Sequence, residues 1–142
     1  MGVYYLDNED LWYNDATSQE LGGAGSFIQS KATASVLVKR YEYHHYNNKS
    51  IFLTDGLGTS FKFRFTAAAY DGESGSIGTA SNILLINISG ILESIPNPMV
   101  ERLNLAREIV KAINHENASD LKITAAITSG GATVTITLTQ NV

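Results

Sequence analysis

Hydrophobic and polar residues alternate with a period of two in two stretches of the chain. In residues 61–65 a phenylalanine occupies every second position, with basic residues between them. In residues 133–139 four threonines alternate with three aliphatic residues. Successive side chains of a β-strand point to opposite faces of the sheet, so each stretch predicts a strand with one buried face and one polar face.

Each of these strands follows a second apolar stretch and a turn. Residues 50–54 and the glycine-containing residues 55–59 precede the phenylalanine strand. Residues 121–127 and the turn at 129–132 precede the threonine strand. Glycine adopts turn conformations without a Cβ clash, so the two pairs of stretches predict two β-hairpins.

The segment between the two hairpins predicts a loop and a further strand. Residues 67–81 are rich in Gly, Ser and Ala and predict a loop. Residues 82–88 are an apolar run without alternation, too short for a stable helix, and predict a strand covered on both faces.

A helix is predicted next, because Asn97 can cap it and Pro98 suits its first position. We expect the helix to end near residues 115–117, after about 18 residues. Spacings of three and four residues give it an apolar stripe, which Leu105, Ile109 and Ala112 widen. The stripe consists of Met99, Leu103, Ala106, Val110 and Ile113.

The first fifty residues have a different character. They contain six of the seven tyrosines and the single tryptophan. Residues 15–30 hold three glycines and few large side chains, so we expect them to be extended or looped. Residues 33–46 predict one long strand.

These elements predict an α+β fold in which one helix covers a mostly antiparallel β-sheet, in the order ββ–β–α–ββ. We expect residues 1–32 to form an extended, aromatic-rich N-terminal arm and residues 33–142 to form the α+β domain. One alternative is an N-terminal strand that joins the chain's own sheet. We favour an arm that also packs on a neighbouring subunit, because Tyr and Trp are enriched at protein interfaces. The residues that we expect at this interface are Tyr4, Tyr5, Trp12, Tyr13, Lys39, Arg40, Tyr41 and Tyr43.

Charge is distributed unevenly along the chain. Residues 1–30 carry a net charge of −5, residues 31–64 carry +4, and the remainder carries −3. One interpretation is a solvated acidic arm beside a domain whose charges happen to be uneven. The other is that the acidic arm docks on a basic strand of its own domain or of an adjacent copy, because opposed charges orient such contacts.

Composition excludes several classes of function. With 142 residues, 44% of them hydrophobic and 17% charged, the chain can bury one core. Its net charge of −4 argues against binding to nucleic acids, and its lack of cysteine excludes disulfides and thiol chemistry. No apolar run has the length of a membrane span, and the first residues do not resemble a signal peptide.

We expect structural roles for the three histidines. His44 and His45 are adjacent, and adjacent residues of a strand point to opposite faces, so the two imidazoles cannot easily chelate one metal. His115 is expected at the C-terminal end of the helix, where positive charge is favoured.

The other candidate motifs lack the context that their chemistry needs. The glycines of residues 22–25 are not followed by a helix, and the acidic residues 7–10 lack the central glycine of an EF-hand loop. Lys39 and Arg40 are too few to hold a nucleic-acid backbone, so we expect Arg40 to stack on a tyrosine within the sheet. We therefore expect no catalytic, cofactor-binding or metal-binding residues and no cofactor.

Residues 50–140 resemble a small β-rich structural module of tailed-bacteriophage virion proteins. The resemblance is carried by the order and spacing of six short stretches. They are residues 51–56, 61–65, 83–88, 112–114 with 121–125, and 134–140.

The resemblance implies a non-enzymatic virion structural protein present in many copies. The first expectation is a capsid decoration (cement) or head-auxiliary protein that stabilises the particle through inter-subunit contacts. Alternatives are a tail tube, connector or fibre-base component, or a carbohydrate-binding adhesin module. The expected partners are copies of the chain and other virion proteins, such as major capsid or tail proteins, with neither nucleic acid nor membrane. The expected location is the virion, assembled in the host cytoplasm.

Overall fold

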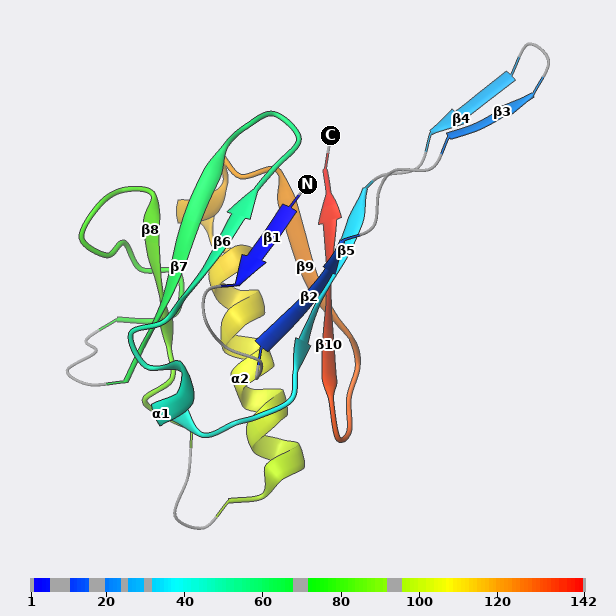
Figure 1. Cartoon of the computed structure of the whole chain (residues 1–142). Coiled ribbons are helices and arrows are strands. Elements are labelled where there is room, and N and C mark those ends of the chain that lie inside the picture. The colour runs from blue at the N-terminus through cyan, green and yellow to red at the C-terminus, as the bar shows by residue number, and fades with distance from the viewer. Residues whose placement is uncertain are drawn as a thin grey trace.

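A computed structural model describes residues 2–5, 11–15, 20–23, 26–29, 32–67, 72–91 and 96–141. For residues 2–29 in these ranges it describes the course and pairing of the backbone. Most of these residues lie in two four-stranded sheets and one long helix (Figure 1).

The first sheet, sheet A, has the strand order β1-β6-β7-β8. All its neighbours are antiparallel except β7 and β8, which run parallel. Because β7 and β8 are parallel, β8 begins at the end of the sheet at which β7 begins. The strands are β1 (Gly2–Tyr5), β6 (Ser50–Thr54), β7 (Ser60–Thr66) and β8 (Ile83–Asn87).

The second sheet, sheet B, is antiparallel throughout, in the order β2-β5-β10-β9. A separate two-stranded ladder pairs β3 with β4. The strands of sheet B are β2 (Leu11–Asp15), β5 (Thr33–Val38), β9 (Ile123–Ser129) and β10 (Val134–Gln140). The ladder consists of β3 (Glu20–Gly23) and β4 (Ser26–Gln29).

The long helix α2 (Pro98–Ile113) lies beside both sheets and contacts β8, β9 and β10. As expected, Pro98 opens it and the side chain of Asn97 accepts a hydrogen bond from the backbone N–H of Val100. Two short helices complete the structure, α1 (Tyr43–Tyr46) and the 3-10 turn η1 (Glu116–Ala118).

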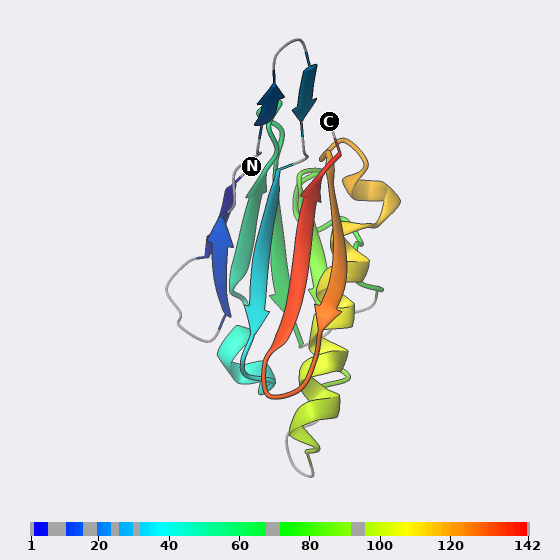
Figure 2. The ribbon, with the colours of Figure 1, turned by 90° about the vertical axis from the view of Figure 1, so that its right-hand side faces the viewer.

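One hydrophobic core is shared by sheet A, sheet B and α2. Val36 of β5, Leu53 of β6, Phe63 of β7, Leu105 of α2 and Ile136 of β10 all have at most 1% of their surface exposed. Strand β1 contacts β2, so the outer strands of the two sheets meet on one side of this core, while α2 packs on the other side (Figure 2).

The predicted fold class is confirmed. The structure is α+β, with a mostly antiparallel β structure and one long helix, and its strands divide between two sheets. Both predicted hairpins are present, as β6–β7 and β9–β10. The phenylalanine strand and the threonine strand each bury their apolar face, with alternating burial along β7 and β10.

Two sequence-based expectations about buried faces are wrong. Strand β8 was expected to be covered on both faces, but only Leu84 and Ile86 are fully buried, because sheet B and α2 cover the inner face alone. The buried face of α2 is centred on Leu105 and Ile109, and Met99 at the start of the expected stripe is 60% exposed.

The long strand expected over residues 33–46 is also wrong in its second half. Strand β5 ends at Val38, and residues 43–46 form α1. The physical reason is topological, because β5 belongs to sheet B and β6 to sheet A, so the chain has to cross between the sheets. Tyr46 fixes this crossing, since it is fully buried, packs on the ring of Phe65 and donates a hydrogen bond to the carbonyl of Arg40.

Candidate assembly interface

The described strands of residues 11–38 pair in the manner of one long β-hairpin, β2 with β5 and β3 with β4, and β3 and β4 extend beyond the two sheets. In the pairing of β2 with β5, Leu11 lies opposite Val38 and Asp15 opposite Ala34. In the pairing of β3 with β4, Glu20 lies opposite Gln29. In an antiparallel hairpin the two residue numbers of each pair have a constant sum. The pairs of β2 with β5 and of β3 with β4 share the same sum, so both ladders belong to a single register. Two residues, 24 and 25, connect β3 to β4.

The outer part of this hairpin, β3 and β4, stands away from the rest of the molecule (Figures 1 and 2). A two-stranded ribbon is at best marginally stable in water without a further layer or strand. The sequence places the apolar residues Leu21, Phe27 and Ile28 in this ribbon.

The inner N-terminal strands β1 and β2 join the chain's own sheets as outer strands. Tyr4 and Tyr5 lie opposite Phe52 and Ile51 in register, and Trp12 lies opposite Leu37. Tyr13 lies opposite Val36. The alternative in which N-terminal strands join the chain's own sheets therefore describes residues 2–5 and 11–15. A division of the chain at residues 32 and 33 and a contact with a neighbouring subunit stay predictions.

The other expected interface residues lie in the crossing from β5 to β6. Lys39 and Arg40 follow the end of β5 and are exposed, whereas Tyr41 is partly buried against the core. Arg40 lies after the end of β5 and not within the sheet, where it was expected. Its Nε instead lies 3.6 Å from the Glu42 carboxylate. Tyr43 begins α1.

Glu42 holds this crossing in place through its carboxyl group. Partial burial alone would raise the pKa of Glu42, but the backbone N–H groups of Glu42 and Tyr41 and the positive charges of Arg40 and His45 outweigh it. They hold the pKa of Glu42 below its usual value. Lys39 and Arg40 therefore lie between the end of β5 and the hydrogen-bonded carboxyl group of Glu42.

The outer edge of β8 is closed by the loop before it. The backbone N–H of Gly75 donates to Leu85 O at 2.7 Å, and the N–H of Leu85 donates to Ser76 O at 2.9 Å. Ser74 Oγ accepts from the N–H of Asn87 at 2.8 Å and donates to the Glu108 carboxylate at 2.7 Å. An unpaired strand edge is a template for pairing with another chain, so this loop blocks association through β8.

The outer edge of β9 is closed at its centre by Asn114, which caps the C-terminus of α2. The Asn114 amide accepts from the N–H of Ala125 and donates to Ala125 O, both at 2.8 Å. A side-chain amide therefore takes the place of a neighbouring strand. The sequence does not predict that Asn114 and Ser74 bind the outer edges of β9 and β8. A polar residue after a helix or in a loop has no pattern that shows which strand it will contact.

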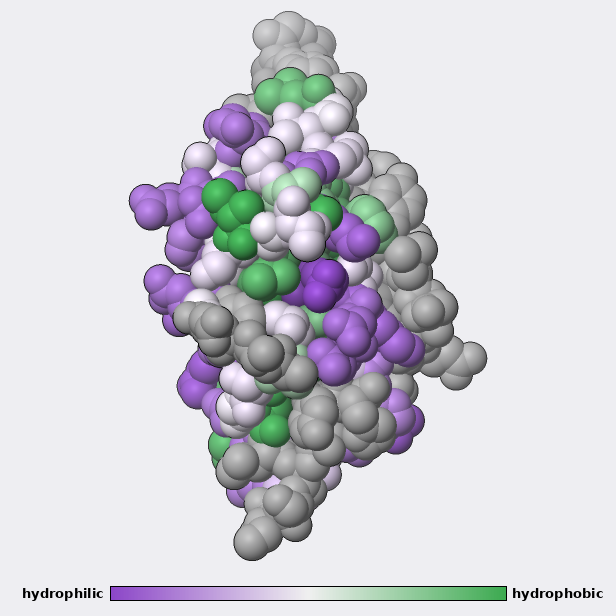
Figure 3. Space-filling model, turned by 90° about the vertical axis from the view of Figure 1, so that its left-hand side faces the viewer, coloured by the Kyte–Doolittle hydropathy of each residue, from purple (hydrophilic) through white to green (hydrophobic). Residues whose placement is uncertain are grey.

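Exposed apolar side chains are few in the described part of the chain. The large ones are Leu57, Ile77, Met99 and Val100. On the face that carries β8, apolar side chains form small separate groups among polar ones (Figure 3). Single exposed apolar residues are normal, whereas Met99 and Val100 are adjacent on the first turn of α2.

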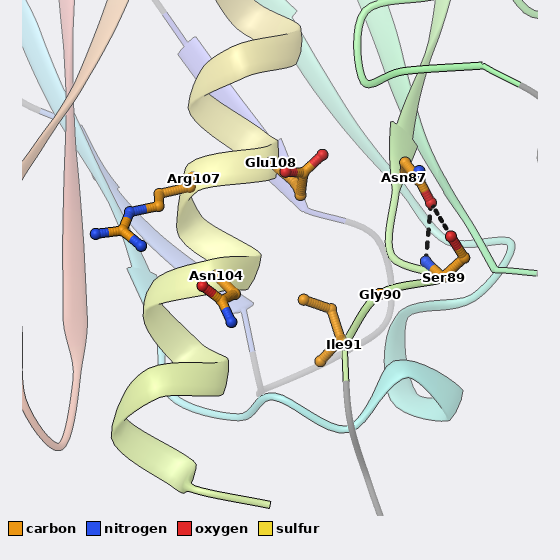
Figure 4. A pocket seen from close by; sticks show the side chains of 7 residues that line it. All are labelled: Asn87, Ser89, Gly90, Ile91, Asn104, Arg107 and Glu108. Atoms are coloured by element: carbon orange, nitrogen blue, oxygen red, sulfur yellow. Dashed lines mark hydrogen bonds between the residues drawn. The ribbon is translucent and has the colours of Figure 1, made fainter.

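A shallow pocket of about 280 Å³ lies between α2 and the end of β8 (Figure 4). The Asn87 side chain accepts hydrogen bonds from the N–H and the hydroxyl of Ser89, and Arg107 points away from this pair. Glu108 binds Ser74. The polar groups of the pocket thus tie the loop before β8 and the turn after it into the fold.

The adjacent His44 and His45 do not lie where the sequence suggested, whereas His115 directly follows the C-terminal end of α2, as expected. His44 and His45 are in α1 rather than on a strand, so the argument from opposite strand faces does not apply. His115 follows the helix and caps η1, where its Nδ1 accepts from the N–H of Asn117 at 3.1 Å. Within the described residues, no three His, Asp or Glu side chains lie close enough to hold a metal ion. The acidic residues 7–10 lie outside the described residues.

None of the helices in the described ranges combines the length and apolar composition needed to cross a membrane. Comparison of the chain with protein-family models, with curated proteins and with solved structures finds no match.

Proposed function

We propose that this chain is a non-enzymatic structural protein of a bacteriophage virion, and that it acts as a capsid decoration or head-auxiliary protein. Its partners are copies of itself and other virion proteins. The bacteriophage context rests on the resemblance of residues 50–140, and the mechanism rests on the geometry of the N-terminal part. Contacts between subunits bury apolar surface, and many modest contacts add up across a particle.

The observation that supports this proposal is the contrast between the two parts of the chain. The loop before β8 pairs with the outer edge of that strand, and Asn114 pairs with the outer edge of β9 at Ala125. The N-terminal residues instead supply the other two outer strands and a ribbon that stands away from the body. A marginally stable ribbon in solvent gives a monomer no stability, whereas in an assembly the same ribbon can contact a neighbouring subunit.

A second candidate is a tail tube or connector subunit. The ribbon projects from one end of the molecule, so it can contact a different surface of the next copy. Such a heterologous contact generates rings or continuous stacks rather than closed dimers. A contact of this kind would suit the rings of a tail tube or connector.

The continuous register allows an experiment that removes the ribbon alone. Because Asp15 lies opposite Ala34, residues 18–31 can be replaced in the same register by Asn-Gly, a two-residue connection that suits an antiparallel hairpin. This keeps Ala32 and Thr33, which pair with β10. The shortened chain should keep its far-ultraviolet circular dichroism and its cooperative unfolding. It should no longer be incorporated when it is supplied to virions assembled without the natural chain.

The matched control is Leu57→Ser, which changes an exposed residue on the β6–β7 turn. This variant should be incorporated as well as the natural chain. Incorporation is measured by mass spectrometry of purified particles, and gold labelling shows whether the chain lies on the head or the tail. Undiminished incorporation of the shortened chain, or absence of the natural chain from virions, would contradict the proposal.

A further inference from the structure

We infer that two copies of this chain associate face to face through the outer surface of sheet B. This inference rests on the proposed assembly function and names a surface through which copies contact each other. The surface, called here the threonine face, consists of the outward side chains of β5, β10 and β9. They belong to the odd-numbered residues 33–37 and 135–139 and to residues 124, 126, 128 and 129.

Within the described part of the chain, the threonine face has no element packed on it. Figure 2 looks onto this face, with β5, β10 and β9 in front and sheet A behind them. Its residues in β5 and β10 are partly exposed and those in β9 are exposed, whereas the residues that alternate with them in β5 and β10 are buried. The core therefore occupies one face of sheet B, and the other face is accessible to a partner.

The threonine face carries no charged side chain at any of its positions. The outer face of sheet A, in contrast, carries Lys62 and Arg64 on β7. In a contact between two identical faces, each copy presents the same patch to the other, so a charged face would bring like charges together. An uncharged sheet face avoids this repulsion, and it also lacks the charges that usually keep exposed sheets from associating.

The hydroxyl groups make the threonine face complementary to itself. A hydroxyl group can donate one hydrogen bond and accept others, so an array of hydroxyls can bond with an identical array. The hydroxyls of Thr128 and Thr137 lie 2.8 Å apart, and that of Ser129 donates to Thr135 at 2.9 Å. These pairs leave acceptor positions for the hydroxyls of a second copy.

The shape of the face also suits a second sheet. Its middle row consists of Ser35, Thr137 and Ala126, which lie opposite one another in register. All three side chains are small, so two such faces can approach to the usual distance between packed sheets, about 10 Å. The loop that pairs with β8 blocks association through that edge, whereas it leaves this face accessible.

The area of the face sets the strength of the contact. Four strands of four to seven residues cover about 19 Å by about 20 Å, or roughly 400 Å² for each copy. A standard stable interface buries about 800 Å² on each partner. We therefore expect a weak dimer in solution, which becomes stable where many copies are held together on a particle.

Opposite charges placed at Ser35 test this pairing. Ser35→Lys and Ser35→Glu should each weaken self-association at least about tenfold, because the two new charges of like sign come close together. An equimolar mixture of the two variants should associate again, since opposite charges then face each other. Sedimentation velocity between about 10 μM and about 1 mM measures the dissociation constants, and circular dichroism shows that both variants are folded.

The matched control is Ser60→Lys, which places the same charge on the exposed Ser60 of sheet A and should leave self-association unchanged. A natural chain that stays monomeric up to about 1 mM would overturn the inference. Unchanged association of both Ser35 variants would also overturn it, as would a mixture that associates no better than either variant alone. If the chain is then still found in virions, the proposed function stands and only the face-to-face contact is wrong.

Discussion

Asp55, at the start of the β6–β7 turn, is a buried carboxylate whose replacement by Asn should destabilise the fold strongly. Only 4% of its surface is exposed. Its Oδ1 accepts from the N–H groups of Leu57 at 2.8 Å and Thr59 at 2.9 Å. Its Oδ2 accepts from the N–H of Lys122 at 3.0 Å, which joins the turn to the segment before β9.

The magnitude follows from these three bonds. In Asp55→Asn the amide oxygen can still accept from Leu57 and Thr59, but the amide nitrogen then faces the N–H of Lys122, donor against donor. An unsatisfied buried N–H costs about 1–3 kcal/mol, and hydrogen bonds to a charged group are worth more than neutral ones. We therefore expect the free energy of unfolding to fall by about 2–4 kcal/mol.

The pH dependence has a definite sign. Burial alone raises the pKa of Asp55, but hydrogen bonds from the backbone N–H groups of Lys122, Thr59 and Leu57 outweigh it and hold the pKa below its usual value. The stabilisation is complete above the pKa of the unfolded chain, about 3.9. It is lost as the pH falls through the lower pKa of the folded protein. The stability difference between the natural chain and Asp55→Asn should therefore narrow below about pH 4.

Urea unfolding at a series of pH values measures both effects, and an unchanged slope shows that the same transition is compared. The matched control is Asp120→Asn, an exposed acidic residue close to Lys122 in sequence. It should change the free energy of unfolding by less than about 0.5 kcal/mol. An Asp55→Asn variant as stable as this control at neutral pH, or a difference that widens in acid, would refute the reasoning.

Two further substitutions test the packing of the core and of the loop before β8, each by urea unfolding. Phe63→Ala removes a fully buried ring and should lower the free energy of unfolding by about 3–5 kcal/mol; a loss below about 1 kcal/mol would show that β7 does not face the core. Gly75 has φ +101° and an added Cβ would lie 2.4 Å from Cγ of His115, so Gly75→Ala should cost more than about 2 kcal/mol. Gly90→Ala, where an added Cβ meets nothing within 4 Å, is its control, and equal losses in the two variants would contradict this account.

The sequence predicts those elements whose pattern has one interpretation. The alternation at Phe61, Phe63 and Phe65 fits a strand and nothing else, and the structure buries all three. The helix was located correctly, but its buried face was not. Apolar residues occupy so many positions of the helix that their pattern does not show where the centre of the buried face lies. The pattern also does not predict that the charged Glu101 in the first turn is buried.

The candidate interface could be predicted only in outline. An aromatic, acidic N-terminal part is visible in composition, but pairing across residues 11–38 depends on which strands meet in space. The stretch from Glu20 to Gln29 has three glycines and little alternation, so its register is not encoded locally. The crossing at Tyr41 and Tyr43 was misread because tyrosines at every second position imitate a strand.

The single register of the long hairpin makes its length adjustable. Two residues inserted on each side, opposite each other between β2 and β3 and between β4 and β5, would move the tip outward by about 7 Å. The inward and outward alternation of both strands would stay in phase, because the shift is an even number of residues. The distance by which the ribbon projects can therefore change in steps of two residues on each strand. The two sheets would keep their pairing unchanged.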